Sequence, residues 1–176
     1  ERAISKSEFL TTSNYENIRY EGFGPNKVAI IVETLTDNKN RTASKLRTIF
    51  QKSGGSLGTQ GSASHNFKQI GLIKIEKTEI NEDEIMELAI DSGSEDCLFN
   101  GETYEIHCNK NEIYNVKKKL EKKINNFIST DLEWLPKNHI EILNSDVKDY
   151  LEFIENLEDD DDIQNIYSNA KIQNQN

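Results

Sequence analysis

The chain has 176 residues and a formal net charge of −10, with 35% hydrophobic and 30% charged residues. These proportions predict a soluble globular protein made of one ordinary domain or two small ones. No stretch of about eighteen apolar residues occurs, so the sequence excludes a helix that spans a membrane.

Cys97 and Cys108 are the only two cysteines in the chain. Two cysteines do not support a disulfide framework, and neither has the paired spacing of a zinc site. We expect both to be reduced core residues, and we expect no metal or other cofactor.

The first ordered element is predicted to follow a polar N-terminal segment. Residues 1–16 are predicted to be a linker, and Glu1–Ile4 resembles the end of a helix whose beginning is absent. Two glycines and a proline between residues 22 and 25 then indicate a turn. The apolar run within Lys27–Leu35 has the length and composition of a strand that is covered on both faces.

A helix is predicted next, over Arg41–Ser53. The polar residues of Asp37–Asn40 supply side chains that commonly begin a helix. Apolar residues recur at helical spacing up to Phe50, and Gly54 is expected to end the helix in the left-handed conformation. A short strand is expected at Ser62–Phe67.

Residues 72–136 predict the order strand, helix, hairpin, helix, strand. The clearest turn signal in the chain is Asn100-Gly101. A type I′ turn at these two residues would place Phe99 opposite Glu102. The order βαββαβ is that of a ferredoxin-like unit.

The residues on either side repeat this order when they are joined. The strand, helix and strand of the first part would be followed by a strand at His139–Leu143, a helix, and a strand at Ile163–Tyr167. The sequence therefore predicts the α+β class, with two ferredoxin-like βαββαβ units, one inserted into the other. The predicted domains are a split α/β domain at 17–71 plus 137–171, an inserted α/β domain at 72–136, and a tail at 172–176.

Positive charge is concentrated in one part of the sequence. Residues 38–75 contain seven Lys or Arg and no Asp or Glu, and Arg41, Lys45 and Lys52 fall on one helical stripe that we expect to face outward. A solvated helix face is the ordinary explanation, but such faces normally carry both signs. The segment therefore predicts a local site for a polyanion such as nucleic acid. The candidate binding residues are Lys39, Arg41, Lys45, Arg47 and Lys52, and the candidate supporting residues are Asn38, Asn40, Gly54, Gly55, Gly58 and Gly61.

Other polar patterns have ordinary explanations. The glycine loop lacks the Lys-Ser/Thr of a P-loop and follows a helix, so turn geometry explains it, with a supporting phosphate contact as the alternative. Asp159–Asp162 lacks the spacing of a calcium loop and predicts an exposed acidic turn. Residues 141–162 hold ten carboxylates against one Lys, which would repel phosphate or meet a basic ribosomal protein. No nucleophile and base stand at a catalytic spacing, so we do not expect an enzyme.

Several motifs resemble the YebC/PmpR family: EGFGP at Glu21–Pro25, TDNKNRTASKLR at Thr36–Arg47 and SGGSLGTQGS at Ser53–Ser62. The segment LEDDDDIQNIYSNA at Leu157–Ala170 is similar to the family's closing helix, turn and strand. Family members resemble one another in having an N-terminal basic helical bundle, a split α/β domain and an inserted α/β domain. The resemblance implies that most of the first domain is absent from this sequence.

The resemblance also implies a non-enzymatic regulator of gene expression. Some members look like translation factors that act with the ribosome, and others are classed as DNA-binding transcriptional regulators. A compact basic site on an acidic protein favours ribosomal RNA over naked duplex DNA. The leading hypothesis is a ribosome-associated translational activator, the alternative is a DNA-binding transcriptional regulator, and a small-molecule-sensing module is the third. We expect a monomer in the cytoplasm, or in the mitochondrial matrix of a eukaryote, with nucleic acid and ribosomal proteins as partners.

Overall fold

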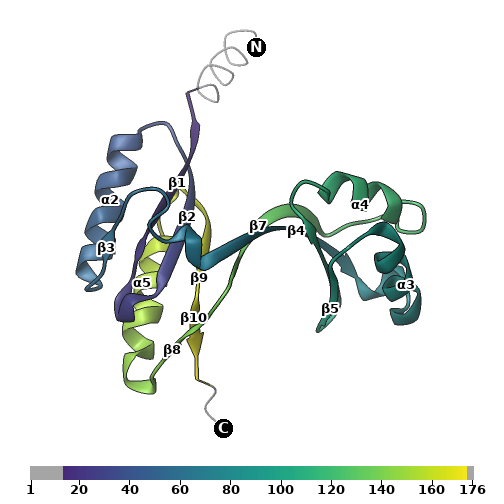
Figure 1. Cartoon of the computed structure of the whole chain (residues 1–176). Helices are drawn as coiled ribbons and strands as arrows, with labels where there is room; N and C mark the ends of the chain where they lie inside the picture. The colour runs from purple at the N-terminus through teal and green to yellow at the C-terminus, as the bar shows by residue number, and fades with distance from the viewer. Residues whose placement is uncertain (1–13, 174–176) are drawn as a thin grey trace. The chain divides into compact units, whose positions relative to one another are not determined.

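The chain forms two compact α/β units (Figure 1). The computed structural model describes residues 14–173. One unit contains the described residues up to Lys68 together with those from Pro136 onward, and the other spans Gln69–Leu135. The predicted α+β class, with one ferredoxin-like unit inserted into another, is confirmed. Within residues 14–173, the helices are too short or too polar to cross a membrane.

The first unit is an antiparallel sheet with two helices. Its elements are β1 (Glu16–Phe23), β2 (Ala29–Thr36), α2 (Lys39–Lys52), β3 (Ser56–Leu57), β8 (Ile140–Ile142), α5 (Val147–Glu158), β9 (Ile163–Ser168) and β10 (Ala170–Ile172), with 3₁₀ turns at Pro25–Lys27, Ser64–Asn66 and Asn144–Asp146. The strand order is β3-β1-β2-β9, and β8 and β10 form a separate parallel pair. All residues of β1 pair with β2, and β3 pairs with the other edge of β1, which makes β1 a central strand of the sheet.

The second unit is also an antiparallel sheet with two helices. Its elements are β4 (Phe67–Glu76), α3 (Glu82–Ser92), β5 (Asp96–Asn100), β6 (Thr103–Asn109), α4 (Ile113–Leu120) and β7 (Ser129–Pro136), with a 3₁₀ turn at Lys77–Glu79. The strand order is β5-β6-β4-β7, so the first and third strands of the unit lie in the centre. This is the arrangement that the βαββαβ order predicts.

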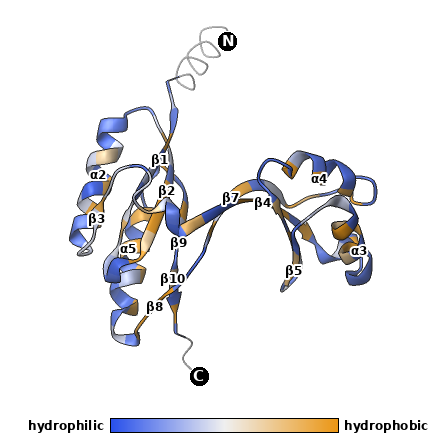
Figure 2. Ribbon diagram, viewed as in Figure 1, coloured by the Kyte–Doolittle hydropathy of each residue, from blue (hydrophilic) through white to orange (hydrophobic). Residues whose placement is uncertain are grey.

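The core of the first unit lies between its sheet and the helices α2 and α5. Ile30 and Val32 of β2 are fully buried and pack in one cluster with Phe50 and Phe153. The two phenylalanine rings meet edge to face, with centroids 5.1 Å apart. Ile31 on the opposite face of β2 is also buried, so this strand is covered on both faces, as predicted. In Figure 2, α5 carries both hydrophobic and hydrophilic residues, as expected for a helix with one buried face.

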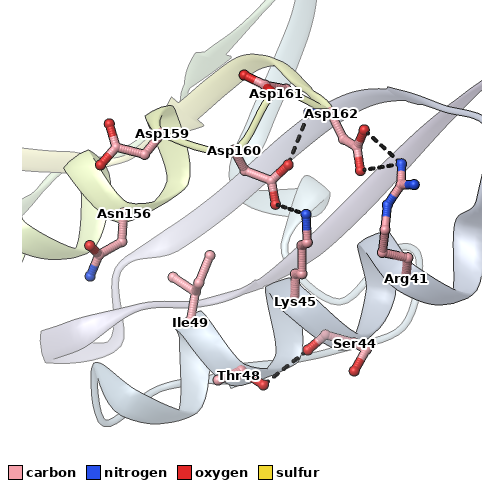
Figure 3. A pocket seen from close by; sticks show the side chains of 10 residues that line it. All are labelled: Arg41, Ser44, Lys45, Thr48, Ile49, Asn156, Asp159, Asp160, Asp161 and Asp162. Carbon is pink, nitrogen blue, oxygen red and sulfur yellow. Dashed lines mark hydrogen bonds and ion pairs between the residues drawn. The ribbon is translucent and has the colours of Figure 1, made fainter.

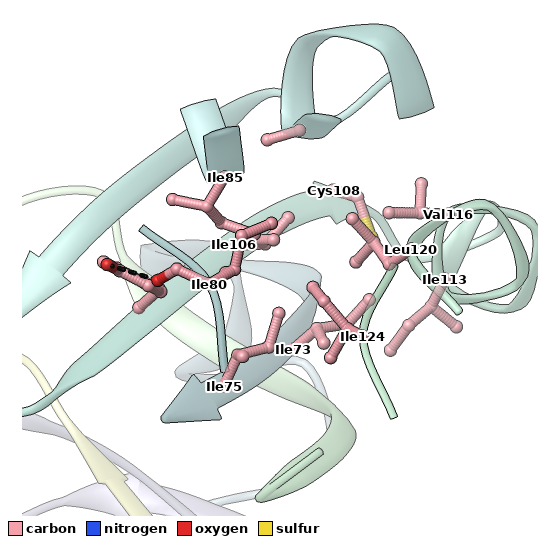
Figure 4. Packing of buried hydrophobic residues seen from close by; sticks show 12 residues of the cluster. Ile73, Ile75, Ile80, Ile85, Ile106, Cys108, Ile113, Val116, Leu120 and Ile124 are labelled. Atoms are coloured by element: carbon pink, nitrogen blue, oxygen red, sulfur yellow. Dashed lines mark hydrogen bonds between the residues drawn. The ribbon is translucent and has the colours of Figure 1, made fainter. Parts of the chain in front are cut away.

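The core of the second unit lies on one face of its sheet (Figure 4). Ile73 and Ile75 of β4 and Ile106 of β6 pack in one cluster with Ile85 of α3 and Leu120 of α4. All five are fully buried. The two helices therefore cover the same face of the sheet.

One strand prediction in the first unit is wrong, and a second predicted strand is present as β8 but lies outside the main sheet. Ser62–Phe67 is not a strand, since residues 64–66 form a 3₁₀ turn and the short β3 lies earlier, within the glycine loop. The segment predicted at His139–Leu143 does not join the main sheet, because β8 pairs with β10. Its expected place is taken by β1, whose sequence ENIRYEGF has too few apolar residues to be recognised. The rest of the predicted linker, residues 1–13, lies outside the described part of the chain.

The predicted hairpin at Asn100-Gly101 is present, but its register differs by two residues. Phe99 lies opposite Tyr104 rather than Glu102. Gly101 and Glu102 consequently occupy the turn, and Gly101 has a φ of 56°. A shift of two residues keeps every side chain on its predicted face of the sheet.

A buried carboxylate on β1 holds the glycine loop in place. Glu21 is 1% exposed and accepts hydrogen bonds from the backbone N–H groups of Gly61 (2.9 Å), Ala63 (3.1 Å) and Ser64 (2.6 Å). Arg19 Nε donates to the same carboxylate at 3.1 Å. Desolvation raises the pKa of Glu21, but the hydrogen bonds from the loop outweigh it and lower the pKa from 4.5 to about 2.

The close approach of the loop to β1 requires glycine. A Cβ atom at Gly55 would overlap the backbone carbonyl of Phe23. Gly54, with a φ of 86°, follows the end of α2 in the left-handed conformation, as predicted.

Replacing Glu21 by glutamine is expected to lower the free energy of unfolding by roughly 1–3 kcal/mol, because the new NH₂ group would face backbone donors. The carboxylate contributes stability above pH 4.5 and loses that contribution as the pH falls toward about 2. The difference between the wild type and Glu21→Gln should therefore shrink on acidification. Urea unfolding of both proteins over this pH range measures the difference in their free energies of unfolding. A difference that does not change with pH would contradict the stabilising role of the ionised Glu21 carboxylate.

Candidate nucleic-acid interface

Helix α2 carries all five predicted nucleic-acid-binding residues. Asn38 caps its first turn, since the Asn38 side chain accepts a hydrogen bond from the N–H of Arg41 at 3.1 Å. Thr42, Leu46 and Phe50 are buried on the inner face. The five candidate cations lie on the remaining surface of the helix, and each of them is exposed.

Arg41 and Lys45 are paired with acids of the turn after α5, and Arg41 is also paired with the neighbouring Asp37. Arg41 Nη2 donates to Asp37 Oδ1 at 2.9 Å and to both carboxylate oxygens of Asp162 at 3.1 Å. Lys45 Nζ lies 4.0 Å from Asp160 Oδ2. Figure 3 shows both side chains extending from α2 toward the turn that follows α5. Arg41 and Lys45 are exposed, as predicted, but both are already paired with acids of the protein.

Asp162 is the centre of this contact. It is 8% exposed, and Thr42 Oγ1 donates a hydrogen bond to its Oδ2 at 2.8 Å. Desolvation raises the pKa of Asp162, but the hydrogen bonds from Thr42 and Arg41, with the charges of Arg41 and Lys45, lower it below its ordinary value. The acidic tract was predicted to be an exposed turn, which holds for Asp159 and Asp161 but is wrong for Asp162.

The surface between α2 and this turn is an open groove of about 700 Å³. Arg41, Lys45 and the four acids Asp159–Asp162 line it together. Lys52 lines a neighbouring groove with Asp149 and Glu152 of α5. Because both signs of charge face each groove, neither is a purely cationic phosphate site.

Three of the five candidate cations are outside these pairs. Across residues 14–173, no ion pair involves Lys39, Arg47 or Lys52. Lys39 begins α2, Lys52 ends it, and Arg47 lies between them. These three are the cations of α2 that can meet an external anion without first breaking an internal pair.

The glycine loop does not offer free amides to a phosphate. The N–H groups of all four candidate glycines donate to protein acceptors: Gly54 to Gln51 O (3.1 Å), Gly55 to Phe50 O (3.0 Å), Gly58 to Glu21 O (2.8 Å) and Gly61 to Glu21 Oε2 (2.9 Å). The turn explanation accounts for this loop, and the alternative of a supporting phosphate contact is contradicted at these four amides. Of the other supporting candidates, Asn38 caps α2 and Asn40 is exposed.

Sequence reasoning assigned no role to Glu21 or Asp162. Both residues lie in motifs that the sequence shows: Glu21 is the first residue of EGFGP, and Asp162 is the last of four consecutive aspartates. Their partners lie about 40 and 120 residues away, so local patterns could not pair them. No cluster of His, Cys, Asp or Glu able to hold a metal ion is found in the described part of the chain.

Comparison with known proteins gives consistent matches over nearly the whole chain. A family model described as "TACO1/YebC second and third domain" matches residues 15–170. A probable transcriptional regulatory protein of Pelagibacter ubique is 62% identical over 99% of this chain and 72% of its own length. Another, of Clostridium beijerinckii, is 42% identical over 97% of this chain and 70% of its own. The crystal structure of a conserved hypothetical protein from Aquifex aeolicus has a TM-score of 0.81 and 34% identity, covering 92% of this chain and 67% of that one.

Replacing Thr42 by valine is expected to lower the free energy of unfolding by roughly 1–3 kcal/mol, because the buried carboxylate of Asp162 loses a hydrogen-bond donor. Thr48→Val is the matched control, since the exposed Thr48 hydroxyl donates only to the backbone of its own helix. The control should change stability by less than about 0.5 kcal/mol. Chemical unfolding of both variants measures the two losses in free energy of unfolding. Equal losses would show that the hydrogen bond from Thr42 to Asp162 does not stabilise the fold.

Proposed function

Because the chain belongs to the TACO1/YebC family, we propose that it is a non-enzymatic regulator of gene expression that associates with nucleic acid and acts at the ribosome as a translation factor. Two relatives with high coverage are named probable transcriptional regulatory proteins, which supports a role in gene expression. The observation that carries the nucleic-acid contact is the set of cations on α2 outside internal ion pairs, Lys39, Arg47 and Lys52.

The electrostatics favour a single local contact. The chain as a whole carries a net charge of −10, so most of its surface repels phosphate. Three cations that each meet one phosphate would give a log–log salt slope of only about −2 to −3. Such a contact would bind free duplex DNA weakly. It would be enough to orient a protein that docks at one site of a large polyanionic assembly such as the ribosome. This argument supports ribosomal RNA as the partner.

DNA-binding transcriptional regulation is the second candidate. The names of the relatives favour it directly. It requires a preferred duplex sequence and retention on that duplex at physiological salt.

Reversing charge at Lys39 and Arg47 together tests the proposal. The pair Lys39→Glu and Arg47→Glu should reduce co-sedimentation with ribosomes about tenfold, because two cations that contact phosphate become repulsive. The control pair Lys118→Glu and Lys119→Glu makes the same charge change on α4, where both lysines are exposed. Sucrose gradients of lysates from cells producing each variant measure the effect, and the control should sediment like the wild type.

The same variants separate the two candidates. Equal sedimentation of both pairs with ribosomes would remove α2 from the proposed contact. Loss of binding to one preferred duplex, with ribosome association unchanged, would replace the translation proposal with the transcriptional one.

A further inference from the structure

The sheet of the second unit has one face that no helix of that unit covers. α3 and α4 both pack on the face that carries Ile73 and Ile106. Residues paired across an antiparallel sheet share a face, and Glu105 pairs with Lys74 on one side and Leu98 on the other. Because Glu105 is adjacent to Ile106 in β6, these three side chains lie on the face opposite the helices.

More carboxylates lie on this open face. Asp96 pairs with His107, which is two residues from Glu105 and so shares its face. The charges of Lys74, Glu105, Asp131 and His107 all act on Glu133 of β7. Asp131 and Glu133 are two residues apart and therefore share a face of β7. We place both on the open face.

The open face carries an excess of negative charge. The carboxylates of Asp96, Glu105, Asp131 and Glu133 lie on this face together with Lys74, whose Nζ is 3.9 Å from Glu105 Oε1. Desolvation raises the pKa of Glu133, and the charges of Glu105 and Asp131 raise it further against the lowering effect of Lys74 and His107. The charges of Glu105 and Asp131 therefore disfavour the ionised form of Glu133.

We propose that this open sheet face is a docking surface for a lysine- and arginine-rich segment of another protein. The charge of the face is complementary to such a segment, and each guanidinium can meet a carboxylate with two hydrogen bonds. Leu98, which is 40% exposed, offers apolar contact to the carbon stems of lysine and arginine side chains. The surface is formed by strands of the second unit, whereas α2 belongs to the first unit. This inference therefore does not depend on the proposed nucleic-acid contact.

Other occupants fit the face less well. Nucleic acid would be repelled by the four carboxylates. A second copy of the chain cannot bind through the same face, because two acidic faces repel each other. A divalent cation lacks a site here, since residues 14–173 contain no group of three or more side chains arranged to hold a metal.

A labelled peptide of nine arginines is the probe, with binding followed by fluorescence anisotropy at about 0.1 M salt. Glu105→Gln with Glu133→Gln should weaken binding about tenfold, because two charge pairs are lost. The control, Glu152→Gln with Glu155→Gln, removes the same charge from exposed positions of α5 in the first unit. It should leave the affinity within about twofold of the wild type.

A second variant keeps the test decisive if the first does not fold. Asp96→Asn with Asp131→Asn removes charge from two exposed positions of the same face, and it should also weaken binding selectively. Weakening by the control as large as that by either test pair would mean that the peptide senses only net charge. That result, or failure of the wild type to bind the peptide at all, would overturn the proposal.

Discussion

The contact of Asp162 with Thr42 and Arg41 joins the two halves of the split unit. α2 precedes the second unit in the sequence and the turn after α5 follows it, so a separation of about 120 residues is bridged by one buried carboxylate. Leu35 N also donates to Asp162 O at 2.8 Å, which anchors the same residue to β2. Breaking one side of such a buried pair leaves an uncompensated charge, so the arrangement fixes how α2 meets the acidic turn.

That contact also decides which charges of α2 are available to a partner. The sequence shows a helix with five cations and no acid, but folding brings acids to two of them from the end of the chain. The available set shrinks to Lys39, Arg47 and Lys52, and the amides of the candidate glycines are already occupied. Family membership supports a role in gene expression, and this reduced set leaves three cations of α2 for the proposed local contact with phosphate.

The elements with strong local signals were predictable and the non-local contacts were not. The apolar run of β2, the capped helix α2 and the hairpin between β5 and β6 each follow from neighbouring residues, and each is present in the structure, the hairpin with its turn one residue later than predicted. β1 lacks apolar alternation, and it is a strand because β2 provides a partner along its whole length. Glu21 and Asp162 are acidic residues in polar segments, where exposure is the ordinary expectation. Their burial depends on donors that are distant in sequence, which a pattern of neighbouring residues cannot reveal.

Ultraviolet crosslinking in cells tests the central claim most directly, provided that the crosslinked nucleic acid and the crosslinked peptide are both identified. The account predicts ribosomal RNA attached to peptides that contain Lys39 or Arg47, at the outer surface of α2. Recovery of genomic DNA in place of ribosomal RNA would contradict the ribosomal assignment. Crosslinks confined to peptides outside α2 would contradict the interface itself.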